Sequence, residues 1–201
     1  MTQLLAEPAA ALVYLLVAFT LVFIWPTLRL KLQTGTNAIV LPGGDTADAI
    51  VGRWFKATMA GLLTMAALAA FAPAPWNNPG TLPLPWPEVR LIAAWLILAG
   101  ALAVVAVAQA QMGSSWRIGI DPKATALREH GLFGRSRNPI FLGMRAMLVG
   151  LFLIMPNALS LAFLLLGEVL IQIQVRFEEM HLERLHEDEY RSYRSRVPRW
   201  L

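Results

Sequence analysis

The run PIFLGMRAMLVGLFLIMPNALSLAFLLLGEVLIQIQV, residues 139–175, decides the fold. It holds two apolar segments, about Ile140–Met155 and Ala158–Val175, which are joined only by Pro156-Asn157. Because two residues permit nothing but a tight turn between neighbouring helices, the run predicts an antiparallel helical hairpin. At roughly 24 Å each by helical rise, both helices are short for a bilayer.

The composition indicates that this hairpin belongs to a membrane protein. Of the 201 residues 57% are hydrophobic, and the charged residues lie in clusters that leave apolar runs of about 20 residues, the length of a membrane-spanning helix. Three more spans are predicted at about Ala9–Leu28, Arg53–Ala72 and Leu91–Ala110. We therefore expect a single all-α, polytopic membrane domain of about five transmembrane helices, with an amphipathic tail helix that ends near Arg196.

Several classes of function are excluded by what the sequence lacks. Without cysteine there are no disulfides, no cysteine-ligated zinc and no thiol catalysis. There is no glycine-rich nucleotide or phosphate loop. Glu178 and His181 have the spacing of a di-iron helix, but such sites need two of these helices, so no metal is expected. We read the pI near 10 as basic residues at one membrane face, and expect no nucleic acid.

The distribution of Lys and Arg predicts the orientation in the membrane. These residues gather in alternate connections, which fits five spans with the N-terminus outside and the C-terminus in the cytoplasm. We expect an integral protein of a bacterial inner membrane. The residues that carry this pattern are Arg29, Lys31, Arg53 and Lys56, then Arg117, Lys123, Arg128, Arg135 and Arg137, and in the tail Arg184, Arg191, Arg194, Arg196 and Arg199.

Two charges lie inside the apolar hairpin. Arg145 and Glu168 are equally far from the Pro156-Asn157 turn, so the two helices place them at the same depth. An isolated charge there costs about 3 kcal/mol or more, so the two are expected to pair or to face a polar cavity. The pair either fixes the register of the hairpin or forms the wall of a polar pocket, and both can hold.

Two short motifs near the hairpin bear further charge. Glu178 and Glu179 point about 100° apart on a helix, so one can face inward while the other meets solvent. Gln172 and Arg176 precede them on the same helix and favour a functional role. The alternative is that the two acids simply begin an ordinary polar segment. Arg137-Asn138-Pro139 leaves free N–H groups at a helix start, which suits an anion, or forms a basic interfacial cap.

These motifs resemble the isoprenylcysteine carboxyl methyltransferase family and its phospholipid methyltransferase relatives. The resemblance covers roughly residues 112–201. It lies in three spaced elements: Leu127-x-x-x-Gly131-x-Phe133-x-x-x-Arg137-Asn138-Pro139-x-Phe141-x-Gly143, then Glu178-Glu179-x-x-Leu182, and then Tyr190-x-x-Tyr193-x-x-Arg196-Val197-Pro198. Residues 1–111 contribute three variable spans.

The resemblance implies a membrane enzyme that uses S-adenosylmethionine on the cytoplasmic side. The cofactor's carboxylate would bind Arg137 or the helix start. Its ammonium and sulfonium groups would lie beside Glu178 or Glu179. Its adenine would stack on Phe133, Phe141 or Trp116. A lipophilic or prenylated acceptor, with an isoprenylcysteine-like carboxylate, a thiol or a lipid amine, would enter from the bilayer lipids. The implied cofactor residues are Leu127, His130, Gly131, Phe133, Arg137, Asn138, Pro139, Phe141, Glu178 and Glu179, and the implied catalytic residues are Arg145, Glu168 and Arg176.

The chain departs from the family pattern at three places. Asn138 replaces the usual His and cannot act as a general base, and Phe141 replaces a Tyr. His186-Glu187 replaces a Phe-Gly, which bears on the geometry of the tail.

Two other functions fit the same hairpin. One is an NADPH-dependent membrane reductase of the sterol reductase type. The acidic pair Glu178-Glu179 disfavours it, because the 2′-phosphate of NADPH calls for basic groups. The other is a non-enzymatic membrane scaffold or transport subunit.

Overall fold

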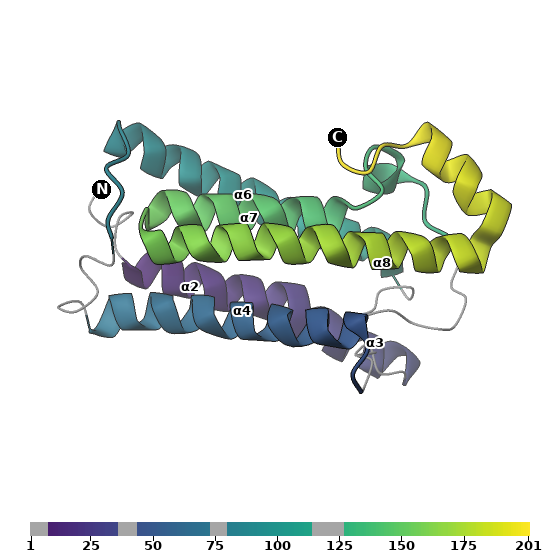
Figure 1. The fold of residues 1–201 in the computed structure, drawn as a ribbon, viewed down its shortest axis with the longest axis horizontal. Helices are drawn as coiled ribbons and strands as arrows, with labels where there is room; N and C mark the ends of the chain where they lie inside the picture. The colour runs from purple at the N-terminus through teal and green to yellow at the C-terminus, as the bar shows by residue number, and fades with distance from the viewer. Residues whose placement is uncertain (1–7, 36–43, 73–79, 114–126) are drawn as a thin grey trace.

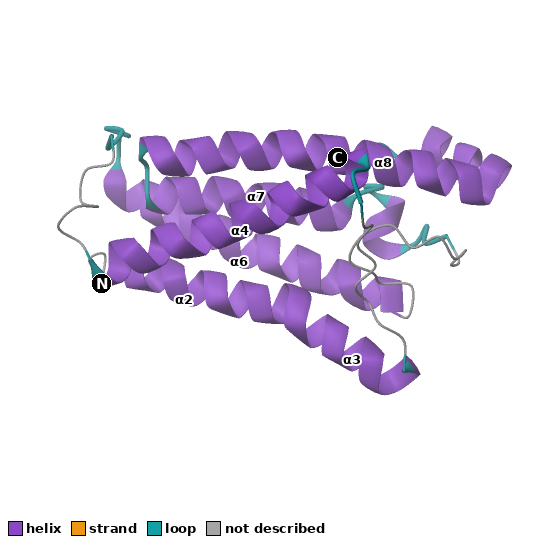
Figure 2. Ribbon diagram, turned by 60° about the horizontal axis from the view of Figure 1, so that its bottom comes forward, coloured by secondary structure: helices purple, strands orange, loops and turns teal. Residues whose placement is uncertain are grey.

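The computed structural model describes residues 8–35, 44–72, 80–113 and 127–201 as a bundle of helices (Figures 1 and 2). The part of the chain so described contains no strand, only one isolated bridge between Thr81 and Asn157. The elements, in order, are α2 (Pro8–Phe19), the π-helix η1 (Thr20–Ile24), α3 (Trp25–Thr34), α4 (Ala47–Phe71), α6 (Pro87–Met112), the 3-10 helix η3 (Gly131–Gly134), α7 (Pro139–Ile154) and α8 (Ala158–Arg196).

The predicted fold class is confirmed. Four helical stretches are long and apolar enough to cross a membrane, namely Pro8–Thr34, Ala47–Phe71, Pro87–Met112 and Ala158–Arg196. The shorter apolar helix α7 completes the hairpin with α8. The polar tail continues α8 from the last apolar span as far as Glu187, where a non-helical residue separates it from a short final helical segment that ends at Arg196.

The first span does not end near Leu28, as the sequence predicted, but runs through Pro26 to Thr34. Proline has no N–H, so the carbonyl of Val22 loses its helical donor. The side chain of Gln109 on α6 donates to that carbonyl over 2.7 Å. The helix widens locally, and the N–H of Trp25 bonds to Thr20 in the π pattern. A buried amide thus lets the helix continue past the proline.

The turn of the hairpin is as tight as predicted. The side chain of Asn157 accepts from the N–H of Ser160 over 2.8 Å, and Ser160 accepts in return from the N–H of Asn157, which forms a capping box for α8. The preceding segment also binds the turn, because Leu82 N–H donates to Pro156 over 2.8 Å. The register of α7 against α8 is therefore fixed at the turn.

Close packing of α6 on α7 positions the start of α7. A Cβ atom on Gly143 would lie 2.5 Å from a methyl of Val105, and one on Gly150 would lie 2.6 Å from Leu98. Such distances leave no room for a side chain, so these glycines allow the two backbones to approach. The apolar core, which includes Leu62, Ala66, Ala94, Leu98, Leu151 and Ile154, surrounds this contact.

Beyond the membrane span, α8 bends sharply at Glu187. This residue has φ 42° and ψ −112°, which lies outside the helical region. Glu187 occupies the position at which the family pattern described above has glycine, the one residue that adopts such angles without strain. After the bend the chain folds back, so that its C-terminal end lies beside the segment that leads into α7 (Figure 1).

Candidate functional site

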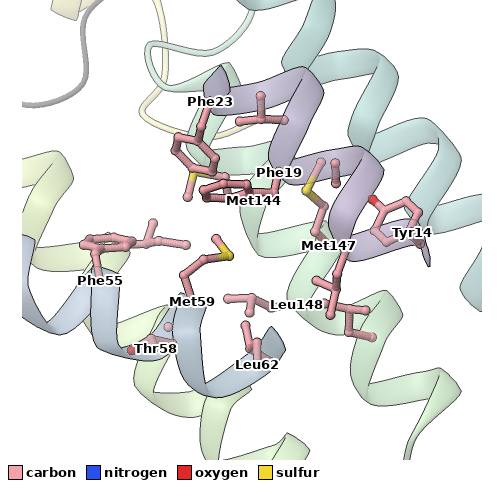
Figure 3. A pocket seen from close by; sticks show the side chains of 16 residues that line it. Tyr14, Phe19, Phe23, Phe55, Thr58, Met59, Leu62, Met144, Met147 and Leu148 are labelled. Carbon is pink, nitrogen blue, oxygen red and sulfur yellow. The ribbon is translucent and has the colours of Figure 1, made fainter. Parts of the chain in front are cut away.

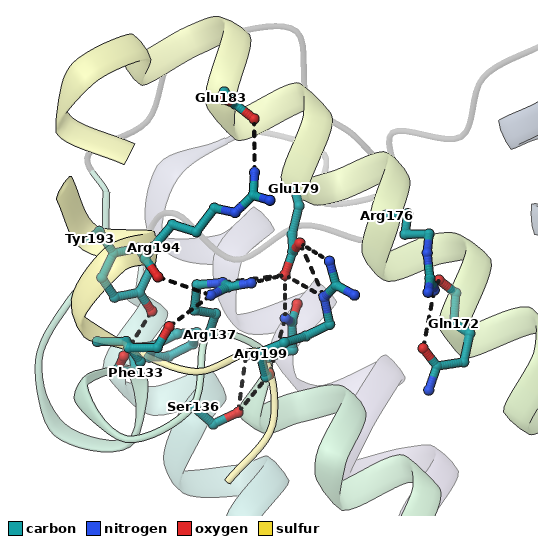
Figure 4. A network of polar contacts seen from close by, with 12 residues as sticks. Phe133, Ser136, Arg137, Gln172, Arg176, Glu179, Glu183, Tyr193, Arg194 and Arg199 are labelled. Carbon is teal, nitrogen blue, oxygen red and sulfur yellow. Dashed lines mark hydrogen bonds and ion pairs between the residues drawn. The ribbon is translucent and has the colours of Figure 1, made fainter. Parts of the chain in front are cut away.

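The centre of the site is the buried carboxylate of Glu179, which is only 5% exposed (Figure 4). Its Oε1 accepts from Nη2 of Arg137 over 2.9 Å and from Nδ2 of Asn138 over 3.2 Å. Its Oε2 accepts from Nη2 of Arg199 over 2.7 Å. Burial would raise the pKa of Glu179, but the hydrogen bonds from Arg199 and Arg137 hold it below its ordinary value. Glu179 is therefore an ionised carboxylate whose charge is balanced by two arginines of the same chain.

The C-terminal tail is bound to the start of α7 through its backbone. The N–H of Arg137 donates to the carbonyl of Pro198 over 3.0 Å, and Nη1 of Arg137 donates to that of Val197 over 2.7 Å. The carbonyl of Arg199 accepts from Oγ of Ser136 over 3.2 Å and from Asn138 over 3.3 Å. Residues 136–138 thus hold the tail across the end of the hairpin.

The loop before α7 is shaped by Gly131 and by the second tail tyrosine. Gly131 has φ 66°, and a Cβ there would lie 2.5 Å from the side chain of Gln111. The oxygen of that amide accepts from the N–H of Leu132 over 2.9 Å. The hydroxyl of Tyr193 donates to the carbonyl of Phe133 over 2.7 Å. The spaced motifs of the sequence therefore meet at one place.

The other predicted residues of this loop lie around the same centre. Phe133, Asn138 and Pro139 are buried, Phe141 and Leu127 are half-buried, and His130 is exposed. Leu127 packs with Leu182 and Val197 beside the two tail tyrosines. Trp116, which was considered for the adenine, lies outside the described residues.

Glu178 differs from its neighbour. It is half-buried, and its nearest polar partner is Gln174, whose Nε2 lies 3.5 Å from Oε1. No ion pair joins it to any residue in the described part of the chain. Burial raises the pKa of Glu178 to about 7, and the charge of Glu179 adds to this. Of the two acids, Glu179 is buried and paired with two arginines, while Glu178 has no charged partner among the described residues.

The predicted pair inside the hairpin forms. Nε of Arg145 donates to Oε2 of Glu168 over 2.7 Å. The other oxygen of Glu168 accepts from Gln172 over 2.8 Å, and Gln172 in turn accepts from Arg176 over 3.1 Å. A ladder of polar side chains thus runs along α8 toward the tail, and Figure 4 shows its last contact, between Gln172 and Arg176.

Sequence reasoning missed three residues of the site, Ser136, Arg199 and Trp200. Arg199 was counted only as a basic tail residue, yet it binds Glu179 in the middle of α8. Trp200 was not singled out, yet its ring lies 4.4 Å from the guanidinium carbon of Arg145. The signal was available in the tail, where an arginine and a tryptophan follow directly on Val197-Pro198.

An apolar cavity of about 70 Å³ lies between α2, α4, α7 and α8 (Figure 3). Phe19, Phe55, Met59 and Met147 contribute to its lining. Met144 and Gly167 also line it, and each precedes one member of the Arg145–Glu168 pair in the chain. The cavity therefore lies within the apolar part of the bundle.

The comparisons with known proteins agree with this arrangement. The family model of phospholipid methyltransferases matches residues 89–189, which comprise α6, α7 and α8 as far as the bend. No curated protein matches the chain. Since the family model covers half of an apolar, multi-helical chain, this integral membrane protein belongs to the phospholipid methyltransferase family.

Proposed function

We propose that this protein transfers a methyl group from S-adenosylmethionine to a lipophilic acceptor that reaches the site from the bilayer. The observation that carries the proposal is the contrast between the two adjacent acids. Glu179 forms ion pairs with Arg137 and Arg199, whereas Glu178 is half-buried and forms no ion pair with a residue in the described part of the chain. The family supplies the reaction type, and the uncompensated acid supplies a place for a cationic ligand.

The residues of the site fit this cofactor. A desolvated carboxylate favours a bound cation, because the cation restores the charged form that burial disfavours. Glu178 would hold the ammonium or the sulfonium. In α7 the N–H of Leu142 donates to the carbonyl of Asn138. The N–H groups of Ile140 and Phe141 lie in the first turn before this bond, where helical N–H groups have no partner within the helix, and would bind the carboxylate of the cofactor.

This assignment revises two expectations from the sequence. Every nitrogen of the Arg137 side chain already donates, to Glu179 or to the carbonyls of Arg194 and Val197. Both oxygens of Glu179 are also used. We therefore assign Arg137 and Glu179 to the wall that shapes the pocket, and not to direct contact with the cofactor.

When bound, S-adenosylmethionine supplies an activated methyl group for in-line displacement by a nucleophile. The contribution of the chain is to align the two reactants and to exclude water. Asn138 holds Glu179 and cannot take a proton. A thiol or carboxylate acceptor that arrives ionised needs no base, whereas an amine must lose a proton to another group. The apolar cavity beside Arg145 and Glu168 is the place for the lipophilic part of the acceptor.

Equilibrium dialysis of the purified protein in a neutral detergent tests the proposal. We expect binding of radiolabelled S-adenosylmethionine and none of NADPH. Glu178→Gln should weaken S-adenosylmethionine binding about tenfold, as for loss of a charge-assisted contact. Glu189→Gln, which removes an exposed acid from the same helix, should not. Binding of NADPH alone would favour the reductase, and binding of neither would favour a scaffold.

A further inference from the structure

The bend of α8 at Glu187 is unfavourable for the two residues that form it. Glu187 has φ 42° and ψ −112°, a conformation that strains any residue with a Cβ. The side chain of His186 is only 10% exposed, and its Nε2 is buried without a hydrogen-bond partner in the described part of the chain. A buried polar atom without a partner also costs free energy. Contacts elsewhere must therefore hold the bend.

Those contacts are made by the residues after the bend, 188–201, which we call the strap. Glu183, before the bend, pairs with Arg194 of the strap over 3.3 Å (Figure 4). The two are 11 positions apart, and a straight helix would separate them by about 16 Å along its axis. The hydroxyl of Tyr193 in the strap donates to the carbonyl of Phe133 over 2.7 Å. Both contacts exist only while α8 is bent.

The last residues of the strap lie across the polar end of the hairpin. Arg199 binds Glu179 on α8 over 2.7 Å, and the ring centre of Trp200 lies 4.4 Å from the guanidinium carbon of Arg145 on α7. The carbonyl of Arg199 accepts from Oγ of Ser136, which is only 2% exposed. The strap therefore covers polar groups that its departure would expose to water.

The two ion pairs of Glu179 allow the strap to leave. A buried carboxylate that loses its only cation is strongly destabilised. Arg137 binds Glu179 over 2.9 Å and precedes α7, outside the strap, so Glu179 keeps one cation when Arg199 departs. The side chain of Arg199 is 30% exposed and meets water already in the closed form. Departure of the strap thus strands no buried charge at this carboxylate.

The residue at position 187 shifts the balance toward opening. A glycine there would adopt the bent conformation without strain and would weaken a straight helix. Glutamate has the opposite preferences, since its Cβ disfavours the bend and it is a good helix former. The buried cluster of Tyr190, Tyr193 and Val197 favours the closed form. A closed major state and a straightened minor state follow from these opposed contributions.

We propose that the strap is a gate, closed in this structure and released when α8 straightens at Glu187. Its release exposes the polar end of the hairpin and lets a water-soluble ligand enter or leave. The two states of the strap do not depend on the proposed function. The identity of the enclosed ligand does, and for that step the inference rests on S-adenosylmethionine as the cofactor.

Labelling of a single thiol tests the two states, because the chain has no cysteine of its own. Ser136→Cys places the thiol beneath the strap, and its rate of reaction with a charged, water-soluble methanethiosulfonate reports opening. In this background Glu187→Gly should slow labelling about fivefold, because it removes the strain. Arg199→Gln should accelerate labelling about tenfold, as for loss of a charge-assisted contact. The matched control is Glu187→Ala, which keeps the Cβ and should label like the parent.

Two outcomes of the labelling would overturn the proposal. The first is an equal rate in the parent, in Glu187→Gly and in Arg199→Gln. The second comes from Thr58→Cys, which places a thiol at a buried position of α4, away from the strap. This thiol should stay unlabelled. If it reacts as fast as the thiol at position 136, the whole protein opens and not the strap.

A second reporter decides if Ser136→Cys does not fold. Arg135→Cys together with Leu201→Cys carries a spin label on the loop before α7 and another at the end of the strap, both at exposed positions. Electron spin resonance should show a short distance and a minor longer one. The longer distance should grow in Arg199→Gln and shrink in Glu187→Gly. One short distance in all of these proteins would overturn the proposal.

Dissociation of radiolabelled S-adenosylmethionine connects the strap with the site. Glu187→Gly should slow dissociation about fivefold relative to the parent and to Glu187→Ala, since the cofactor leaves only while the strap is open. Equal dissociation rates, with the labelling differences present, would overturn the gate. Failure of the parent to bind the cofactor would overturn the proposed function, and the labelling would still decide between one and two states of the strap.

Discussion

Arg199 and Glu179 lie 20 positions apart in the chain and are joined by hydrogen bonds from both Nε and Nη2, the shortest of 2.7 Å. The contact ties the end of the chain to the middle of α8. Because Arg137 binds the same carboxylate, one buried acid connects α7, α8 and the tail. This carboxylate therefore contributes to the stability of all three segments at this end of the molecule.

Glu179→Gln should therefore be among the most damaging changes. It leaves two guanidiniums without their counter-charge, and breaking a buried pair from one side costs about 3 kcal/mol or more. We expect a clear fall in the thermal unfolding midpoint in detergent. The neighbouring Glu178→Gln serves as the control and should not lower it, because Glu178 has no ion pair in the described structure to lose. Equal losses would show that the ion pairs of Glu179 contribute no extra stability.

The raised pKa of Glu178 predicts a pH dependence. This acid has a pKa of about 7 in the folded protein and 4.5 as its ordinary value, so between these pH values the folded state holds a proton that the unfolded state has lost. Stability should therefore fall as the pH rises from about 4.5 to about 7. Glu178→Gln should flatten this part of the profile, as measured by unfolding midpoints across the range. A profile that is identical in both proteins would place the titration elsewhere.

Arg145 and Glu168 should be energetically coupled. A double-mutant cycle with Arg145→Ala and Glu168→Ala, followed by thermal unfolding in detergent, measures this coupling. Each single change leaves one charge at membrane depth without its partner, so the double mutant should lose less stability than the sum of the two. The same single changes should also reduce methyl transfer, because Met144 and Gly167, the chain neighbours of the pair, line the cavity proposed for the acceptor. Strictly additive losses would contradict the contact.

Glu187→Gly should stabilise the protein. Glu187 has a positive φ, and a residue with a Cβ held in such a conformation is strained by about 1–3 kcal/mol. We expect a gain of about 1 kcal/mol, because glycine relieves this strain but is freer in the unfolded chain. Glu187→Ala, which keeps the Cβ, is the control and should bring no such gain. The unfolding midpoints of the three proteins decide the matter.

Gly143→Ala and Gly100→Ala form a matched pair on the two helices that pack most closely. The new methyl at position 143 would lie 2.5 Å from Val105 and 3.0 Å from a backbone carbonyl, so α6 and α7 would have to separate. At position 100 nothing lies within 4 Å. We expect Gly143→Ala to lower the unfolding midpoint by an amount that corresponds to about 1–3 kcal/mol, as for overpacking. Gly100→Ala should be neutral or slightly stabilising.

Much of the fold could be predicted because the relevant signals are local in the sequence. Apolar run length predicts the spans, and the two-residue turn fixes the hairpin. Equal spacing from that turn was enough to pair Arg145 with Glu168. The tail bend was not predicted, although the replacement of glycine by Glu187 marked a position that bears on the geometry of the tail.

The remainder depends on contacts between distant segments. Nothing in the sequence near Pro26 indicates that Gln109, on another helix, would replace its missing donor. The role of Arg137 was assigned to a ligand because a basic residue at a helix start suits an anion. The structure gives it an internal anion instead, Glu179, and the chain supplies the second cation from Arg199. The local sequence pattern indicates which residues at the site are charged, but only the tertiary structure shows which of them form ion pairs with one another.

The short helix α7 has a consequence for the lipid around it. Its 16 residues extend about 24 Å, whereas the 26 residues of its neighbour α6 extend about 39 Å. A hydrocarbon layer about 30 Å thick matches neither, so the leaflet must thin beside α7 or polar head groups must dip toward its ends. Such hydrophobic mismatch lowers the head-group layer toward Arg145.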